Sequence, residues 1–371
     1  MKKIYICSLK FAPGLFKEFT LLGKHFFEND TNVEYVLSKG YQSFFKKEKN
    51  VTYLTKSRNT KEMLLDLIAF PLYALKIKQI LKNKHKNETT QFLFYNPHPL
   101  NPLLQWVIKT FSEATVITVL HEPYKTKKER MEYGLSGYIF FSIVNIFQIM
   151  SIKISDKIIT MSPYGKSLYT KYFSKYSSKL VSANLLLPDL TDVSAGTRRY
   201  YSFIGRVNKG KGIQDFINTI NYCVDNKIFN YDFMIITSSN IQEYISTLHQ
   251  GWEQVLTVIN HPTISDKEIN DVIAQSKAVL ILHQTASQSG VLPLAYQLKT
   301  PIIARNLKAF EQYIDGSGEL LNLYFKPSEL LEACQNIQTN FDTYSRNATT
   351  IYEANFSEKN FANFYKDIIY A

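Results

Sequence analysis

Cysteine is scarce in this chain, and the scarcity argues against two kinds of protein. Among 371 residues there are three cysteines, Cys7, Cys223 and Cys334, which are widely spaced and odd in number. A disulfide framework needs an even set of cysteines and an oxidising compartment, so we expect free thiols in a reducing one. CxxC and HxxxH spacings are also missing, so no motif predicts a metal site.

Two further signals are absent. A GxGxxG motif follows neither of the apolar runs 3–8 and 200–204, which leaves a dinucleotide oxidoreductase without a sequence signature. The N-terminus also has no short basic-then-apolar leader, because Ser8 and Lys10 interrupt the first apolar run. That run therefore predicts an opening strand rather than a signal peptide, and we expect a cytoplasmic protein.

Acidic residues are few in the first half of the chain. Up to residue 190 there are 28 Lys and Arg against 14 Asp and Glu, a net charge of +14. From residue 191 onward there are 15 Lys and Arg against 18 Asp and Glu, a net charge of −3. A basic half joined to a mildly acidic half indicates that the first half faces something anionic. A membrane surface and a phosphorylated lipid fit this charge. Nucleic acid fits less well, since the lysines are scattered and no aromatic platform motif occurs.

Short apolar runs alternate with longer amphipathic stretches, which is the pattern of α/β layering. Pro188, Gly196 and several short polar residues interrupt the alternation between 185 and 199, so we place a domain boundary there. The predicted architecture is α/β, with two doubly wound Rossmann-like domains, 1–190 and 191–350, facing a cleft that binds ligands at the carboxyl ends of the strands. Predicted strands span 3–8, 34–37, 91–95, 116–120, 157–160, 200–204, 231–237, 254–259, 278–282 and 302–304, and predicted helices include 17–28, 61–82 and 102–111.

The most informative stretch is 203–212, Phe-Ile-Gly-Arg-Val-Asn-Lys-Gly-Lys-Gly. An apolar run ends at Gly205, and Arg206 and Lys211 follow in a glycine-rich turn before a helical pattern begins at Ile213. Backbone N–H groups and the dipole at such a helix start favour anions. Arg206 suits a phosphate through paired donors, and Lys211 suits it as a point charge. The pattern predicts a diphosphate site, with an ordinary strand–helix loop as the alternative.

A second polar loop, at 283–290, lies between the predicted strand 278–282 and a helical stretch. If both loops sit at the same sheet edge, the backbone amides of Ser289, Gly290 and Val291 face the same anion as the first loop. Two such loops in one domain favour an anion site more than either does alone. A serine-rich connector that caps a helix is the alternative.

These blocks resemble, in order, the donor domain of glycosyltransferase family 4 enzymes. The resemblance includes the stretch 260–269, the strand 300–304 and Glu311, and it covers most of residues 200–330. The first half matches more loosely, through Pro13-Gly14, His98, His121 and the segment 155–162. The resemblance implies a glycosyltransferase of the B-type fold and bacterial surface-polysaccharide type, in which a C-terminal helix, 351–371, crosses back to the first domain.

The resemblance also implies the reaction. A nucleotide-diphosphate sugar, bound mainly by the second domain, is the donor, and a glycan or lipid-linked molecule is the acceptor; no cofactor and no metal are expected, because Arg and Lys neutralise the departing diphosphate. Transfer with retained configuration is expected. The implied catalytic residues are His121, Arg206 and Lys211. The implied donor-binding residues are Gly205, Arg206, Lys211, Gln288, Ser289, Gly290, Val291 and Glu311, and the implied acceptor-binding residues are Pro13, Gly14, His98 and His121.

The sequence departs from the family pattern at one place. The family usually carries two glutamates eight positions apart around the second loop, which here correspond to Ala286 or Ser287 and to Leu294 or Ala295. None of these is acidic, so we expect the neutral side chains at 288–289 to contact the sugar instead. Donor identity and stereochemistry stay open, and a catalytically lapsed nucleotide- or carbohydrate-binding protein of the same fold is the alternative function.

Three of these residues have structural alternatives. His121 ends the predicted strand 116–120, where an imidazole can bond a sugar hydroxyl and transfer protons near neutral pH, or can simply cap or pack. His98 lies between two prolines and suits a structural turn. Glu311 suits a solvated helix surface.

The longest stretch without charge is Tyr133–Ile152, which is long enough to span a bilayer. Several polar residues dilute it, and a span would put the two parts of the first domain on opposite sides of the membrane. We expect a largely buried helix with an exposed apolar ridge at the bilayer interface. With the lysine-rich helix 63–82, it predicts peripheral contact with the inner face of the cytoplasmic membrane; an ordinary core helix is the alternative.

Overall fold

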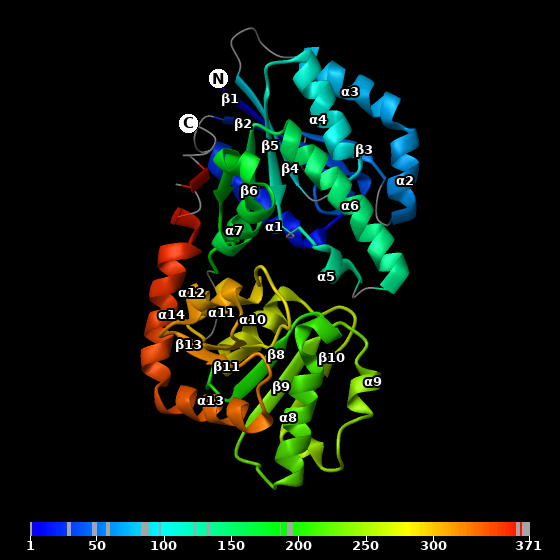
Figure 1. Ribbon diagram of the computed structural model, residues 1–371. Coiled ribbons are helices and arrows are strands. Elements are labelled where there is room, and N and C mark those ends of the chain that lie inside the picture. The colour runs from blue at the N-terminus through cyan, green and yellow to red at the C-terminus, as the bar shows by residue number, and fades with distance from the viewer. Residues whose placement is uncertain are drawn as a thin grey trace. The chain divides into compact units, whose positions relative to one another are not determined.

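The computed structural model describes residues 2–27, 31–46, 50–56, 60–82, 89–95, 98–121, 124–131, 134–185, 187–190, 196–360 and 364–365. The chain divides into two compact units, Met1–Asn184 and Leu185–Ala371. Each unit has its own parallel sheet with helices packed against it (Figure 1). The predicted α/β class with two Rossmann-like domains is confirmed.

The first unit has a seven-stranded parallel sheet in the order β3-β2-β1-β4-β5-β6-β7. The central strand β1 is buried over its last five residues, as expected of a parallel strand covered on both faces. The strands are β1 Lys2–Ser8, β2 Thr31–Ser38, β3 Val51–Thr55, β4 Thr89–Tyr95, β5 Thr115–Leu120, β6 Lys157–Thr160 and β7 Leu180–Ser182.

Seven α-helices and three short 3-10 turns are described in the first unit. Helices α3, α4 and α6 lie side by side (Figure 1). The helix predicted at 61–82 is two helices, because Pro71 has no N–H to continue the ladder and disfavours helical geometry before it. The helices are α1 Phe16–Phe27, α2 Thr60–Ile68, α3 Phe70–Lys82, α4 Leu100–Phe111, α5 Lys127–Met131, α6 Gly134–Ile154 and α7 Pro163–Tyr172, and the turns are η1 Pro13–Leu15, η2 Lys39–Ser43 and η3 Ser174–Lys179.

The predicted burial of the charge-free helix is wrong. Helix α6 covers this stretch from residue 134, and only Asn145, Gln148, Ser151 and Ile152 are buried in it. It is long and apolar enough to cross a membrane, yet only 22% of its most apolar window is buried. Periodicity could not reveal this, because nearly every position of the stretch is apolar or small.

The second unit has a six-stranded parallel sheet in the order β10-β9-β8-β11-β12-β13. Its strands are β8 Tyr200–Ile204, β9 Asp232–Thr237, β10 Leu256–Asn260, β11 Ser276–Ile281, β12 Ile302–Arg305 and β13 Gly318–Leu321. Its helices are α8 Ile213–Asp225, α9 Gln242–Ile245, α10 Asp266–Ala274, α11 Val291–Gln297, α12 Lys308–Ile314, α13 Pro327–Thr339 and α14 Phe341–Asn355, with 3-10 turns η4 Lys209–Lys211 and η5 Trp252–Gln254.

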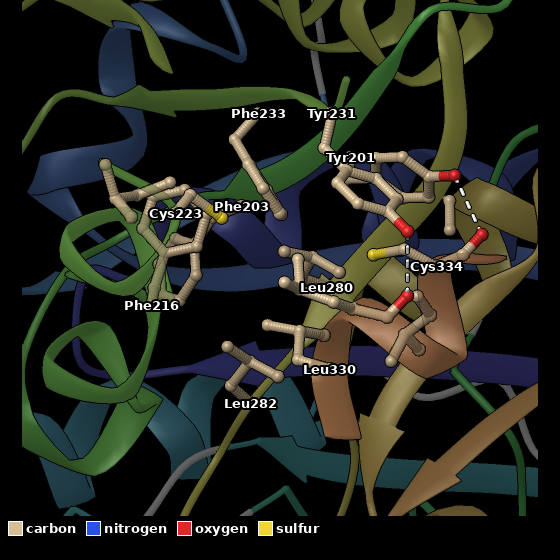
Figure 2. Close-up of a cluster of buried hydrophobic side chains, with 14 of the residues drawn as sticks. Tyr201, Phe203, Phe216, Cys223, Tyr231, Phe233, Leu280, Leu282, Leu330 and Cys334 are labelled. Carbon is tan, nitrogen blue, oxygen red and sulfur yellow. Dashed lines mark hydrogen bonds between the residues drawn. The ribbon is translucent and has the colours of Figure 1, made fainter. Parts of the chain in front are cut away.

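An aromatic core fixes β8 against α8 and α13 in the second unit (Figure 2). The ring of Phe203 lies 5.4 Å from that of Phe216 on α8. Tyr201 is fully buried, and its hydroxyl donates to the carbonyl of Cys334 on α13 at 2.8 Å. Because both rings of β8 are anchored in this core, the loop that follows the strand leaves the sheet from a fixed point.

The end of the chain belongs to the second unit. Helix α14 packs against α11, and the hydroxyl of Tyr352 donates to Asp189 at 2.6 Å, which ties α14 to the start of this unit. Of the C-terminal helix expected at 351–371, residues 361–363 and 366–371 lie outside the described residues.

The three strands that the sequence did not predict, β3, β7 and β13, all lie at sheet edges. An edge strand has only one neighbouring strand and need not be covered on both faces, so it carries no long apolar run. β7 has three residues, and three of the four residues of β13 are only half-buried. The interior strands were predictable because they are buried on both faces.

Candidate functional site

The first predicted loop leaves β8 at Gly205. Its φ of +100° suits glycine, and its N–H donates to the carbonyl of Ile236 at 3.0 Å. A Cβ built on Gly205 would meet no atom within 4 Å, so the space beside this turn is open. Arg206, the next residue, is exposed and makes no hydrogen bond or ion pair with any residue that the structure describes. Its guanidinium is therefore available to an anion.

The two predicted loops lie against each other, which a shared anion site requires. The N–H of Gln284 donates to the carbonyl of Gly210 at 2.9 Å. Gly212, at φ +77°, caps α8 so closely against β11's end that a Cβ on it would lie 2.1 Å from the carbonyl oxygen of Leu282. Only glycine fits this left-handed, close-packed position. Because β8 and β11 are paired neighbours, both loops leave the same edge of the sheet.

Lys211 lies in this junction and is half-buried. Burial lowers the pKa of His283 to about 3, and the positive charge of Lys211 contributes to the shift. The centre of the His283 ring also lies 5.9 Å from that of Phe310. This histidine therefore packs beside the junction as an uncharged side chain at physiological pH. Among the side chains that the structure describes, the positive charge of the two loops comes from Arg206 and Lys211.

Arg305 is the residue of this region that sequence reasoning missed. It ends β12 and is 5% exposed, and its guanidinium is ion-paired with Asp215 in the first turn of α8 and donates to the carbonyl of Leu323. Its Nε also donates, at 3.4 Å, to the Leu282 carbonyl that Gly212 packs against. Arg305 therefore links the helix that follows the first loop to the residue that precedes the second. An arginine directly after an apolar run was the available signal.

The second loop ends at a short helix. Ser289 is buried, Gln288 and Val291 are half-buried, and Gly290 is exposed with open space where a Cβ would lie. Because α11 has only seven residues, its dipole is small, and anion binding there would depend on individual N–H groups.

The structure also bears on the missing glutamates. Ala295 is fully buried in the core of the unit, whereas Leu294 is half-buried. A carboxylate at 295 would be enclosed by apolar side chains at a large cost, whereas one at 294 could reach solvent. Glu311 is exposed on α12, which reaches the loops through Phe310.

In the first unit, the turn at Pro13 and Gly14 follows β1 and is exposed. The hydroxyl of Tyr41 holds it, accepting from the N–H of Ala12 at 3.0 Å and donating to the Ala12 carbonyl at 2.9 Å. A Cβ on Gly14 would meet nothing within 4 Å. His98 is different, since it is 1% exposed and its Nδ1 accepts from the Leu100 N–H at 3.1 Å, which caps the start of α4.

His121 follows β5 and lies beside a carboxyl group that the sequence did not reveal. Its Nε2 is 3.7 Å from Oε2 of Glu18 on α1, and its ring is 5.7 Å from that of Tyr95 at the end of β4. Burial raises the pKa of Glu18 to about 8, which the Tyr95 hydrogen bond partly offsets, and burial lowers the pKa of His121 to about 4. Between these values both side chains are neutral.

Glu18 gives a testable pH dependence of stability. Its pKa is raised on folding, so the stability that it contributes is lost as pH rises toward 8, whereas the lowered pKa of His121 removes stability only as pH falls below 6.5. Relative to the wild type, Glu18→Gln should therefore gain about 2 kcal/mol in unfolding free energy between pH 6.5 and pH 8.5, because the wild type keeps losing stability until the pH reaches the raised pKa of Glu18. Urea titrations at the two pH values measure this gain.

A matched control is Glu113→Gln, which removes an exposed carboxylate of the same unit. It should keep the wild-type decline between the two pH values. If Glu18→Gln also keeps that decline, the carboxyl group is not held in its neutral form.

Comparison with solved structures identifies the fold of the chain. No protein-family model matches the chain, and no curated protein matches it in sequence. Among solved structures, sucrose-phosphate synthase from Thermosynechococcus elongatus is 14% identical with a TM-score of 0.72, and the match covers 100% of this chain and 98% of that one. HepE of Anabaena, in complex with UDP and glucose, is 13% identical with a TM-score of 0.70, covering 99% of each chain.

The pneumococcal O-GlcNAc transferase GtfA, in complex with UDP and GlcNAc, is similar at 12% identity with a TM-score of 0.71, covering 99% of this chain and 98% of that one. Sequence identities this low carry information on fold alone. Along its whole length the chain has the α/β fold of these proteins, the B-type glycosyltransferase fold.

Proposed function

We propose that the protein is a glycosyltransferase that moves a sugar from a nucleotide-diphosphate donor to a glycan or lipid-linked acceptor in surface-polysaccharide synthesis. The observation that carries the proposal is the junction of the two loops, which brings Arg206, Lys211 and the open turn at Gly205 to one edge of the sheet. UDP in two of the similar structures supports a UDP-sugar as donor. The expected location is the cytoplasm.

The chemistry follows from the charge that develops during transfer. The bond from the sugar's anomeric carbon to the diphosphate oxygen breaks, a bond to an acceptor oxygen forms, and the acceptor hydroxyl loses its proton. Negative charge grows on the departing diphosphate, and donors fixed in advance, such as Arg206 and Lys211, stabilise it. In this mechanism the side chains of Arg206 and Lys211 neutralise the charge of the diphosphate. The proposal also includes retention of the configuration at the anomeric carbon.

The first unit contributes the acceptor side of the proposal. The exposed turn at Pro13 and Gly14 and the neutral imidazole of His121 are the groups assigned to acceptor and sugar hydroxyls. A neutral histidine can both donate and accept a hydrogen bond, as sugar hydroxyls require. His98 is buried and caps the start of α4, so in this proposal it supports the acceptor side by fixing that helix rather than by touching the sugar acceptor.

A catalytically lapsed nucleotide- or carbohydrate-binding protein is the second candidate. It is favoured by the loop at 282–298, which has no carboxylate where the family has two. In that case Arg206 and Lys211 would bind a diphosphate without promoting its departure.

Turnover of a panel of UDP- and GDP-sugars, with soluble glycan acceptors and release of nucleoside diphosphate as the readout, separates the two candidates. We expect transfer with one class of donor. Nucleotide binding by calorimetry, without transfer or hydrolysis across the panel, would identify the lapsed protein. Absence of both binding and turnover would refute either function.

A further inference from the structure

Helix α6 exposes apolar side chains and buries polar ones, the reverse of an ordinary amphipathic helix in a soluble protein. Its exposed side is a row of large aliphatic side chains at helical spacing, which we call the apolar ridge: Leu135, Ile139, Ile143, Ile146 and Met150, exposed by 36% to 79%. Spacings of three and four residues place them on one face. At a rise of 1.5 Å per residue, the ridge runs about 23 Å along the helix from Leu135 to Met150.

The opposite side of α6 is polar and buried. The amide of Asn145 donates to the carbonyl of Lys125 at 2.7 Å, and the amide of Gln148 donates to the hydroxyl of Tyr169 on α7. These bonds fix the rotation of the helix about its axis. The apolar ridge is therefore held outward by the fold, rather than exposed because the helix is loosely packed.

Neighbouring helices continue the apolar surface. On α2 and α3, Leu65, Ile68, Leu72 and Leu75 are exposed by 58% to 79%, again at spacings of three and four. Helix α4 packs against both α3 and α6 and exposes Trp106 by 57%. So many large apolar side chains exposed on neighbouring helices mark a binding surface, since soluble monomers rarely expose them together.

Exposed cations accompany the apolar ridge. Lys153 is exposed three residues beyond Met150 at the end of α6, and Lys76 is exposed on α3. The ammonium of Lys125 lies over the Phe141 ring at 5.1 Å, on the same side of α6 as Asn145 and Gln148, so it does not border the ridge. Lys153 and Lys76 are the cations available to the headgroups of an anionic bilayer that meets the ridge.

The topology excludes a transmembrane path for α6. Its flanking strands β5 and β6 are paired in one sheet, with Ile117 opposite Lys157. The helix lies against that sheet, so lipid can reach only its outer side. Aliphatic side chains accompanied by exposed lysines fit lipid better than a protein partner, whose contact sites are enriched in Tyr, Trp and Arg.

We propose that the apolar ridge, with the exposed leucines and isoleucine of α2 and α3, docks on the surface of an anionic phospholipid bilayer. This inference is independent of the proposed transfer, because these helices contain none of the residues assigned to it. An anionic bilayer would also account for the excess of positive charge in the first half of the chain.

The test is co-sedimentation of the full chain with vesicles of phosphatidylcholine and phosphatidylglycerol in equal parts, compared with vesicles of phosphatidylcholine alone. We expect binding to the mixed vesicles that weakens at high salt. The double variant Ile139→Gln/Ile146→Gln should bind at least about tenfold more weakly. The matched control Phe229→Gln changes an exposed aromatic residue of the second unit and should bind like the wild type.

Tryptophan fluorescence gives a second readout, because the chain has two tryptophans. In a Trp252→Phe background, brominated lipids should quench Trp106. Transfer to a soluble acceptor by the double variant should equal that of the wild type, which separates this inference from the proposed function. Equal vesicle binding by the double variant and the wild type, or no quenching of Trp106, would overturn the inference. So would a dimer formed without vesicles that the double variant disperses, since the occupant would then be a second copy.

Discussion

Arg206→Ala is expected to lower kcat for sugar transfer about 10²- to 10³-fold and to leave stability unchanged. The side chain makes no contact with the described residues that its removal could break, so the loss falls on the donor alone. A donor aimed at developing charge acts mainly on the transition state, so kcat should fall more than donor affinity. Initial rates with saturating UDP-sugar, beside urea unfolding of the same preparation, measure both effects.

The matched control is Arg199→Ala. Arg199 immediately precedes β8, whereas Arg206 follows the opposite end of the same strand, and the Arg199 side chain is ion-paired on the surface with Asp232 at 3.0 Å. It should retain wild-type transfer. Unchanged transfer in both Arg206→Ala and Lys211→Ala would mean that the diphosphate does not bind at these loops.

Arg305→Met is expected to destabilise the protein by about 3 kcal/mol or more. Methionine keeps the apolar length of the side chain but leaves Asp215 without its partner and the carbonyl of Leu323 without a donor. Removing one member of a largely buried pair costs more than the pair contributes, because the remaining charge stays partly desolvated. The midpoint of urea unfolding followed by tyrosine fluorescence would show the change.

The double variant Arg305→Met/Asp215→Leu tests the reason for that loss. It removes the carboxylate of Asp215, which Arg305→Met leaves unpaired, and should recover part of the lost unfolding free energy. A loss for Arg305→Met below about 1 kcal/mol would mean that water already solvates the pair. Arg305 contacts Asp215, just after the first loop, and Leu282, just before the second, and it lies outside the predicted anion site. Donor affinity should therefore also weaken in the single variant, even at temperatures where it is folded.

Local sequence was enough for the interior of both sheets and for the two loops. Strands such as β6 and β8 were predicted to the residue, because burial on both faces demands an uninterrupted apolar run. The loops at 205–212 and 283–290 were found because glycine, arginine and lysine in short order have few other uses between a strand and a helix. Three of the four edge strands, β3, β7 and β13, carry no such pattern and were missed, whereas the edge strand β10 was predicted.

The pairs that surround the sites could not be predicted from local pattern. Arg305 and Asp215 are 90 positions apart, and Glu18 meets His121 only because α1 and the end of β5 come together in the fold. Each of these side chains is common on protein surfaces. Their burial, and with it the shifted pKa values of Glu18 and His121, is a property of packing.

The sequence by itself determined the alternation of strands and helices, the uneven charge and the two glycine-containing loops, since each is written in neighbouring residues. The tertiary structure decided that the two loops touch, that Gly212 must be glycine, and that α6 turns its amides inward and its isoleucines outward. The physical reason is the same in each case. Contacts between distant segments depend on which faces pack together, and a stretch that is apolar on every side does not specify its own buried face.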